Sequence, residues 1–214
     1  MDAGSAVVAQ DFKERQEHIP NITGDYHGAG KMGAEYFIRK GFKNFAFYGF
    51  KNIVWSRERM LGFDNRVKEE GYTVHQFEHN RRLKYRELWY YKPSALSKWL
   101  KSLPKPVALM CCDDNQAMHI AEACRISNIR IPEEVAVLGV DNDEMICNLS
   151  DPPLSSVGLD IEKGGYEAAR LLHTMIKTKN KEFYDVVVEP TQVVTRNSTD
   201  IYAAKDKYIG MALK

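Results

Sequence analysis

The chain alternates between short apolar runs and longer segments in which apolar residues recur at helical spacing. The apolar runs predict strands at 45–48, 72–77, 107–111 and 135–140. The segments between them predict helices at 31–40, 56–70 (with Ser56 as N-cap), 93–102 and 115–127. Strands that are apolar throughout and separated by helices are typical of a parallel sheet covered on both faces. The pattern therefore predicts an α/β fold with a doubly wound parallel sheet.

Beyond Pro152 and Pro153 the pattern is less regular. It predicts an extended segment, an amphipathic helix and two short strands, at 154–159, 163–177, 186–188 and 192–195. At the N-terminus, 6–9 is strand-like but has no preceding strand–helix units. The segment 202–214 is helical in pattern and stops without a cap. Both ends lead us to expect a piece of a longer chain.

Charge and composition narrow the function classes. The 214 residues include 30 Lys and Arg against 29 Asp and Glu, a net charge of +1. This balance gives no basic footprint for nucleic acid, so we expect no direct DNA contact from this chain. No run approaches the roughly 20 apolar residues of a membrane span, and no signal-peptide pattern opens the chain. We therefore expect a cytoplasmic protein without membrane contact, in which Cys111, Cys112, Cys124 and Cys147 are reduced core thiols.

One motif raises the question of a nucleotide cofactor. Gly28, Gly30 and Gly33 satisfy GxGxxG at the start of a helix. Dinucleotide binding also needs a strand directly before the turn and an acid at the end of the next strand, and the sequence predicts neither. We interpret these glycines as helix-packing residues and expect no cofactor. His75 and His79 flank a strand end, where HxxxH spacing does not join two ligands, so we expect no metal.

Polar side chains follow the carboxyl ends of three predicted strands. Trp55 and Arg59 follow the first strand, Asp113 and Asp114 the third, and Asp141 the fourth. In open α/β sheets, ligands bind beyond these ends. Sugar hydroxyls donate to carboxylates and accept from Arg, and an indole covers the apolar face of a sugar ring. The sequence therefore predicts a sugar-binding site, in which Asp113 and Asp114 share one role.

Each of these residues also has a structural interpretation. Asp113 and Asp114 could cap the following helix, and Asp141 could begin a turn. Agreement among three strand ends favours ligand binding for Arg59 and Asp141, while Trp55 stays open between ligand contact and packing. We expect replacement of Arg59 by alanine to weaken sugar binding in the full-length protein with little change in the fold.

The same segments, taken in order, resemble the lactose-repressor (LacI/GalR) family. The similar motifs are Asp25 with Gly30, Gly33 and 36–46, RxxGF at 59–63, (N/D)DxxA at 113–117, vPedvaviGfD at 131–141 and RNST at 196–199. Together they span about residues 20–200. Within the family, these segments look most like the xylose-operon activators, which carry a sensor followed by an AraC-type DNA-binding domain.

The resemblance implies a periplasmic-binding-protein-like fold of type I, with one lobe complete and the other partial. Residues 1–24 would be a remnant of the N-terminal lobe and hinge, 25–150 the C-terminal lobe, and 151–200 the return to the N-terminal lobe. Residues 201–214 would lead into a DNA-binding domain that is absent from this chain. A monosaccharide effector, xylose above all, would bind between the lobes and close them. The resemblance further implies a homodimer that contacts DNA only through the absent domain.

Motif by motif, the resemblance places Arg59, Asp141 and one of Asp113 and Asp114 against the sugar, and Asp25 at the hinge. The sequence departs from the family at Asp113, where Asn is usual, and lacks the family's first strand–helix units. Two other function classes remain. A periplasmic sugar-binding protein would need a signal peptide, and a small sugar-processing α/β enzyme would need an activated group beyond paired carboxylates. We therefore predict a binding protein without catalytic residues.

Overall fold

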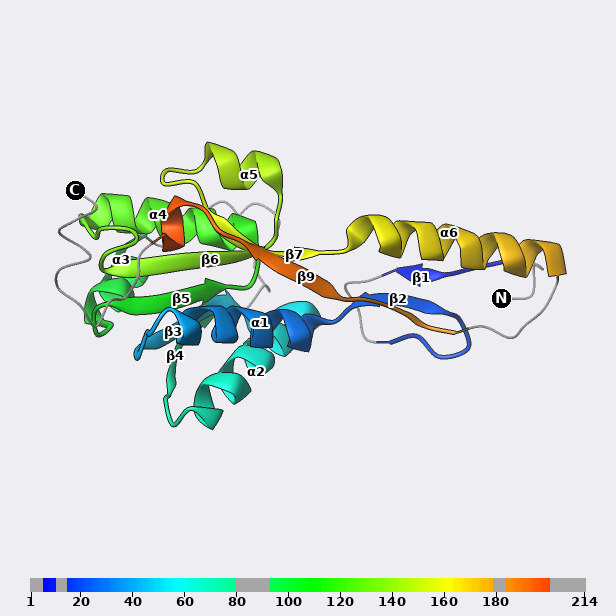
Figure 1. Cartoon of the computed structure of the whole chain (residues 1–214), viewed down its shortest axis with the longest axis horizontal. Helices are drawn as coiled ribbons and strands as arrows, with labels where there is room; N and C mark the ends of the chain where they lie inside the picture. The colour runs from blue at the N-terminus through cyan, green and yellow to red at the C-terminus, as the bar shows by residue number, and fades with distance from the viewer. Residues whose placement is uncertain (1–5, 11–14, 80–92, 179–183, 201–214) are drawn as a thin grey trace.

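The computed structural model describes residues 6–10, 15–79, 93–178 and 184–200, and the chain is elongated (Figure 1). A large lobe holds a six-stranded sheet between helices. A narrower extension, which we call the small lobe, holds a three-stranded sheet beside one long helix.

The sheet of the large lobe has the order β4-β3-β5-β6-β7-β9. Its strands are β3 (Phe45–Phe50), β4 (Val74–His79), β5 (Val107–Cys111), β6 (Val135–Asp141), β7 (Ser155–Leu159) and β9 (Pro190–Val194). The first five strands are parallel, and β9 runs antiparallel to β7. The predicted doubly wound parallel sheet is confirmed. The order reverses between β3 and β5, the position at which such sheets bind ligands.

Helices cover both faces of this sheet because its strands are apolar on both sides. The helices α1 (Tyr26–Arg39) and α2 (Val54–Glu69) pack on the face formed by Phe45 and Phe47. The opposite face, formed by Ala46 and Tyr48, is covered by α3 (Pro93–Ser102) and α4 (Asp114–Ser127), with the short α5 (Glu144–Leu149) beside α4. Successive strand residues thus feed two separate cores.

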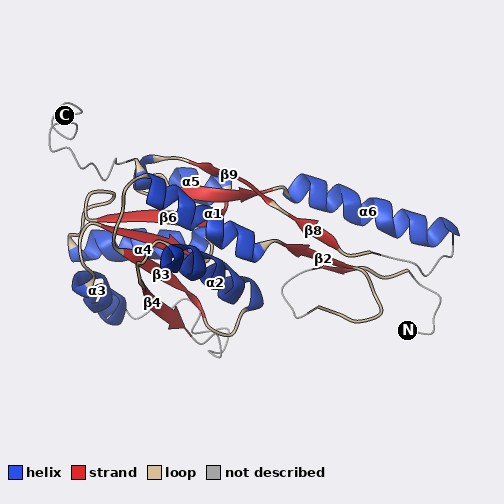
Figure 2. Cartoon of the chain, turned by 60° about the horizontal axis from the view of Figure 1, so that its bottom comes forward, coloured by secondary structure: helices blue, strands red, loops and turns tan. Residues whose placement is uncertain are grey.

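The small lobe pairs segments that lie far apart in the sequence. Its parallel sheet has the order β1-β2-β8, from β1 (Ala9–Gln10), β2 (Asn21–Gly24) and β8 (Val186–Val188). The helix α6 (Ile161–Thr178) runs along this sheet (Figure 2). Gly164 lies so close to Val188 that a β-carbon there would be 2.5 Å from Val188 Cγ2.

The chain crosses between the lobes three times, at β2–α1, β7–α6 and β8–β9. The crossings are hydrogen-bonded to one another: Asp25 N donates to Val188 O at 2.8 Å, and Asp160 N donates to Glu189 O at 3.2 Å. Because β7 and β9 belong to the large sheet, the return to the small lobe lies beyond Leu159. The lobe division implied by the resemblance, 25–150 against 151–200, places that return earlier.

Several element boundaries differ from the sequence prediction. Helix α1 begins at Tyr26, earlier than predicted, because Asp25 caps it. The prediction that Ser56 caps the next helix is wrong, because α2 begins at Val54 and Ser56 lies within its first turn. The Ser56 hydroxyl instead accepts a hydrogen bond from Phe50 N, at the end of β3, at 2.8 Å. The strand β2, the helix α5 and a 3-10 turn η1 (Asn197–Thr199) were not predicted. The predicted terminal helix 202–214 lies outside the described residues.

Two glycines of the GxGxxG motif lie where a neighbouring helix or strand leaves no room for a side chain. A β-carbon on Gly30 would lie 2.0 Å from Arg59 O in α2, and one on Gly33 would lie 2.6 Å from Met110 Sδ in β5. Reciprocally, a β-carbon on Gly62 of α2 would lie 2.0 Å from His27 O. The motif therefore lets α1 approach α2 and the sheet closely, as interpreted from the sequence.

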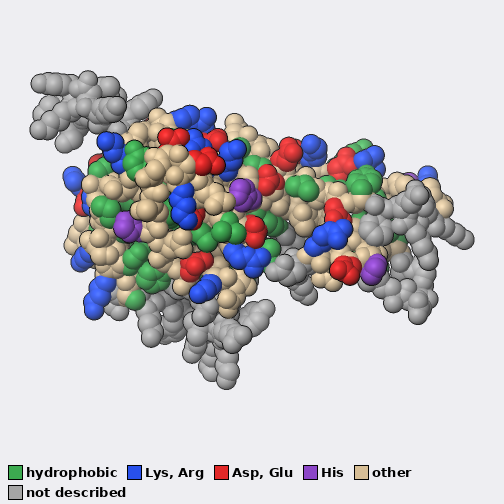
Figure 3. All heavy atoms as spheres, turned by 90° about the horizontal axis from the view of Figure 1, so that it is seen from below, with side chains coloured by type: hydrophobic (Ala, Val, Ile, Leu, Met, Phe, Trp, Pro, Cys, Tyr) green, Lys and Arg blue, Asp and Glu red, His purple; other side chains and the backbone are tan. Residues whose placement is uncertain are grey.

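The distribution of charged side chains and the state of the cysteines can both be compared with the sequence predictions. On the face seen in Figure 3, acidic and basic side chains are interspersed, without a large patch of one sign. The four cysteines are unbridged and buried, as predicted, and desolvation raises the pKa of Cys111 and Cys112 well above the ordinary thiol value. Among the described helices, none combines the length and the apolar character needed to span a bilayer.

Candidate functional site

A cavity of about 440 Å³ lies where the large lobe meets the small lobe. On the large-lobe side, its lining comes from the segments that follow β3, β5 and β6, the three strand ends singled out from the sequence. Trp55, Arg59, Asp113 and Asp141 all line it. The structure thus brings four of the six candidate residues together at the point where the strand order reverses.

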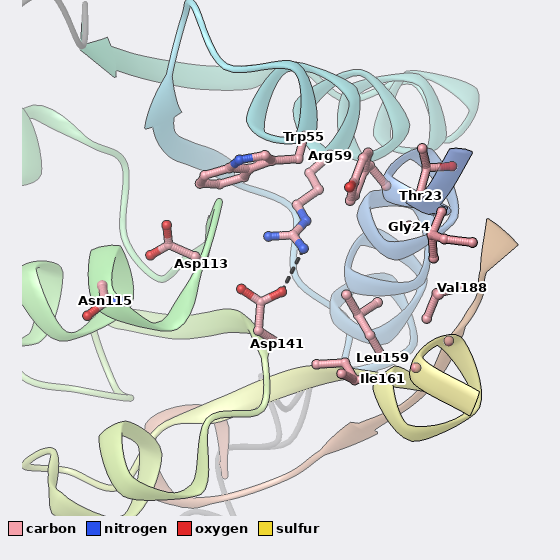
Figure 4. Close-up of a pocket in the computed structure, with 14 residues that line it drawn as sticks. Thr23, Gly24, Trp55, Arg59, Asp113, Asn115, Asp141, Leu159, Ile161 and Val188 are labelled. Atoms are coloured by element: carbon pink, nitrogen blue, oxygen red, sulfur yellow. Dashed lines mark hydrogen bonds and ion pairs between the residues drawn. The ribbon is translucent and has the colours of Figure 1, made fainter. Parts of the chain in front are cut away.

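Arg59 is a buried cation in the large-lobe side of the cavity, and its guanidinium is held by two hydrogen bonds. Its Nη1 donates to Cys112 O at 2.5 Å, and its Nη2 donates to Asp141 Oδ1 at 2.6 Å (Figure 4). The guanidinium carbon lies 5.4 Å from the centre of the Tyr26 ring and 5.2 Å from that of Trp55, within cation–π range. Only 4% of the Arg59 side chain is exposed. Its main action is therefore to hold Asp141 in place.

Asp141 and Asp113 supply the acceptors of the cavity. The Asp141 side chain is 39% exposed although it is ion-paired. Asp113 caps α4, with Oδ1 accepting from Gln116 N at 2.7 Å, and it also lines the cavity. Burial raises the pKa of Asp113 above its ordinary value. The capping and lining positions of Asp113 are therefore compatible.

Asp114 and Asp25 do not line the cavity. Asp114 is 2% exposed; its Oδ1 accepts from Ser156 Oγ at 2.6 Å and its Oδ2 from Asp143 N at 2.8 Å. Asp25 caps α1 by accepting from Gly28 N at 2.7 Å. Within the pair at 113–114, only the first carboxylate reaches the cavity, and Asp114 instead orders the loop that follows β6.

The small lobe contributes a different surface. Its side of the cavity is apolar and includes Ile22, Ile161 and Val188, with Thr23 beside them. Leu159, at the end of β7, lies next to Ile161 and continues this apolar surface from the large lobe (Figure 4). A molecule held here meets acidic oxygens and aromatic rings on one side and aliphatic groups on the other. That combination suits a polyol with hydroxyl edges and C–H faces.

Sequence reasoning missed Tyr26, Thr23 and Asn115, which also line the cavity. Asn115 follows the Asp pair directly, so its position was available as a signal. Tyr26 and Thr23 flank the first crossing, whose strand was not recognised. Two buried donors in the lining, Trp55 Nε1 and Arg59 Nε, have no hydrogen-bond partner within the described residues. Among those residues, no group of three or more His, Cys, Asp or Glu side chains is placed to hold a metal ion.

The burial of Asp114 is expected to make the unfolding free energy of the chain depend on pH. Burial, the largest cause, raises its pKa from 3.8 to about 6. Between these values the folded chain keeps a proton that the unfolded chain has released, so folding is favoured at low pH and this contribution is lost as pH rises through 6. We expect Asp114 to lower the unfolding free energy by about 2–3 kcal/mol between pH 4 and pH 7.

The variant Asp114→Asn removes this titration while keeping the side-chain shape. Urea unfolding of both proteins from pH 4 to pH 7 measures the difference. We expect the gap in unfolding free energy between variant and wild type to shift in favour of the variant as pH rises. A gap that stays constant across the range would contradict a raised pKa for Asp114.

Comparison with known proteins adds to this geometry. The family model of the periplasmic binding protein-like domain matches residues 34–199. The xylose operon regulatory protein of Haemophilus influenzae is 33% identical over 199 residues, covering 92% of this chain and 51% of that protein. The protein of the same name from Escherichia coli is 32% identical over 238 residues, with 98% and 60% covered. The chain thus spans roughly half to three fifths of these relatives.

Solved structures share the fold. The xylose-binding transcription activator XylR superposes with a TM-score of 0.83 and 27% identity, over 97% of this chain and 56% of that one. A LacI family regulator from Enterococcus faecium with bound ribose gives a TM-score of 0.76 at 17% identity, over 90% of this chain and 70% of that one. The resemblance noted from the motifs is confirmed. The chain belongs to the periplasmic binding protein-like domain family.

Proposed function

We propose that the chain is the sugar-sensing part of a bacterial transcription regulator and that its cavity binds a monosaccharide, with D-xylose as the first candidate. The observation that carries this proposal is the meeting of Asp113, Asp141, Arg59 and Trp55, from three strand ends, around one cavity. The names of the relatives support xylose. We place the chain among cytoplasmic binding proteins, not among enzymes.

In the proposed mechanism, Asp141 and Asp113 accept hydrogen bonds from sugar hydroxyls. Arg59 holds Asp141 in position, and Trp55 and the aliphatic wall cover the C–H faces of the ring. Because the lining comes from both lobes, the sugar gains its full set of contacts only when the lobes close. In the whole protein, we propose that closure alters a homodimer and, through it, a DNA-binding domain beyond this chain.

The experiment is isothermal titration of the chain with D-xylose, L-arabinose, D-ribose, D-glucose and xylitol. We expect D-xylose to bind most tightly among them. Asp141→Asn should weaken xylose binding by roughly 10- to 100-fold, because a hydrogen bond to a charged acceptor contributes about 1.5–3 kcal/mol. The matched control is Asp64→Asn, which changes an acid that is ion-paired with Lys68 in α2 at 2.6 Å and does not line the cavity.

We expect the Asp64→Asn control to bind xylose like the wild type. Tighter binding of another sugar would replace xylose as the effector while keeping the cavity. Heat signals absent for every sugar at millimolar concentration would reject sugar binding by this chain. Equal losses in the two variants would reject the role of Asp141.

A further inference from the structure

The loop that carries Asp141 has an unusual backbone. Asp141 and the next residue, Asn142, have φ values of 103° and 52°. Residues with a β-carbon adopt this left-handed region uncommonly and at a cost in free energy, although Asp and Asn do so more readily than most. Two such residues in succession, at the edge of the cavity, direct attention to the contacts that hold them in this conformation. We call residues 141–143 the β6 turn.

One restraint comes from inside the cavity and another from outside it. Arg59 holds the carboxylate of Asp141 from the cavity side. From the opposite side, Arg196 Nη1 donates to Asn142 Oδ1 at 3.0 Å and to Leu154 O at 2.9 Å. Arg196 Nε also donates to Asn148 Oδ1 at 3.0 Å, in α5. The guanidinium groups of Arg59 and Arg196 thus bind the side chains of two adjacent residues of the β6 turn.

The backbone amides of the β6 turn are anchored as well. Asn142 N donates to Ser156 Oγ at 3.0 Å, and that hydroxyl donates to Asp114 Oδ1. Asp143 N donates to Asp114 Oδ2. These amides should therefore be protected from exchange with solvent while the β6 turn keeps its observed conformation.

Arg196 is itself fixed by the strands of the large lobe. Its amide donates to Ser155 Oγ at 2.7 Å, and Ser155 N donates to Ser198 Oγ at 2.8 Å. The Ser198 hydroxyl then donates to Val137 O at 2.6 Å, in the same strand that ends at Asp141. The segment after β9 is thus attached to β6 and β7 at several points, and Arg196 reaches back from it to the β6 turn.

We propose that Arg196 is a positioning residue of the cavity: by clamping Asn142, it sets the strained β6 turn so that Asp141 presents its carboxylate to the sugar. It acts without lining the cavity. Because coupling between two positions is reciprocal, a sugar bound to Asp141 also stabilises the contacts of Arg196. The segment 196–200, at the end of the described chain, then responds to the occupancy of the cavity. The effect on sugar binding rests on the proposed function, whereas the clamp on the β6 turn does not.

The first measurement needs no sugar. Hydrogen exchange at the amides of Asn142 and Asp143 is followed by NMR in the wild type, in Arg196→Gln and in the control Arg125→Gln. Arg125 donates to Glu122 on the surface of α4, so its replacement removes the side-chain contacts of a guanidinium that does not touch the β6 turn. We expect at least about 10-fold faster exchange in Arg196→Gln and no change in the control. Unchanged exchange in Arg196→Gln would overturn the proposal.

The second measurement is a double-mutant cycle on xylose affinity. We expect Arg196→Gln to weaken binding by roughly 10-fold, Arg196→Lys to recover part of the loss, and Arg125→Gln to bind normally. In the Asp141→Asn background, the effect of Arg196→Gln should nearly vanish, because Arg196 acts through Asp141. A merely structural role would instead give independent losses that multiply, and that result would overturn the proposal. If the wild type binds no sugar, the proposed function fails. The hydrogen-exchange measurement alone then tests whether Arg196 holds the β6 turn through Asn142.

Discussion

Replacing Arg59 by alanine is expected to cost the folded chain about 2–4 kcal/mol and to weaken xylose binding at least about 100-fold. The variant takes the guanidinium away from Asp141 and from Cys112 O, and it opens a gap between the rings of Tyr26 and Trp55. The sequence alone suggested little change in the fold. The burial of the side chain revises that expectation, because a buried guanidinium is also a packing element.

Urea unfolding and xylose titration measure the two effects separately. Arg57→Ala is the matched control: it lies on the same helix, its side chain is 43% exposed and it pairs with the neighbouring Glu58. We expect that variant to lose less than about 0.5 kcal/mol and to bind xylose normally. If Arg59→Ala were as stable as Arg57→Ala, the central position of Arg59 would be contradicted.

The second large effect is expected at the crossing of α1 and α2. Gly30→Ala places a β-carbon 2.0 Å from Arg59 O and 2.8 Å from Phe63 N, and both are backbone atoms that cannot rotate away. The helices must separate, and we expect a loss of about 3–5 kcal/mol in unfolding free energy. Gly62→Ala, which meets His27 O at 2.0 Å, should produce a similar loss from the other side of the contact.

Gly165→Ala is the control for this series. A β-carbon at this position would meet no atom within 4 Å, and the residue is exposed within α6. We expect a gain of roughly 0.5–1 kcal/mol, because alanine favours a helix over glycine. Chemical denaturation of the three variants in parallel gives the comparison. A Gly30→Ala protein that unfolds at the same urea concentration as the wild type would show that the motif does not serve helix packing.

Much of the large lobe could be predicted from the sequence because its strands are apolar on both faces. Such runs, like the one from Val135 to Val140, leave little choice but a covered parallel sheet. The small lobe was predicted less completely: its helix α6 and strand β8 match the predicted segments 163–177 and 186–188, but its strand β2 was not recognised. Its strand β2 has only four residues, of which Asn21 and Thr23 are polar, and it is defined by pairing with β8 far along the chain. Non-local pairing leaves no local periodicity to read.

The candidate site was predicted to the level of strand ends but not of single atoms. Asp113 and Asp114 are adjacent, and no pattern could say which carboxylate faces the cavity. The structure separates them because Asp113 precedes the first turn of α4, whereas Asp114 lies inside it and turns toward Ser156. The N-cap assigned to Ser56 failed for a related reason: its hydroxyl serves the end of β3 instead of the start of the helix.

The most direct test of sugar binding in this cavity is a crystal structure of the chain in complex with D-xylose. We expect one sugar in the cavity, with its hydroxyls within hydrogen-bond distance of the carboxylates of Asp141 and Asp113 and a C–H face toward Trp55. Xylose bound at another place on the molecule, with this cavity occupied only by solvent, would contradict this expectation.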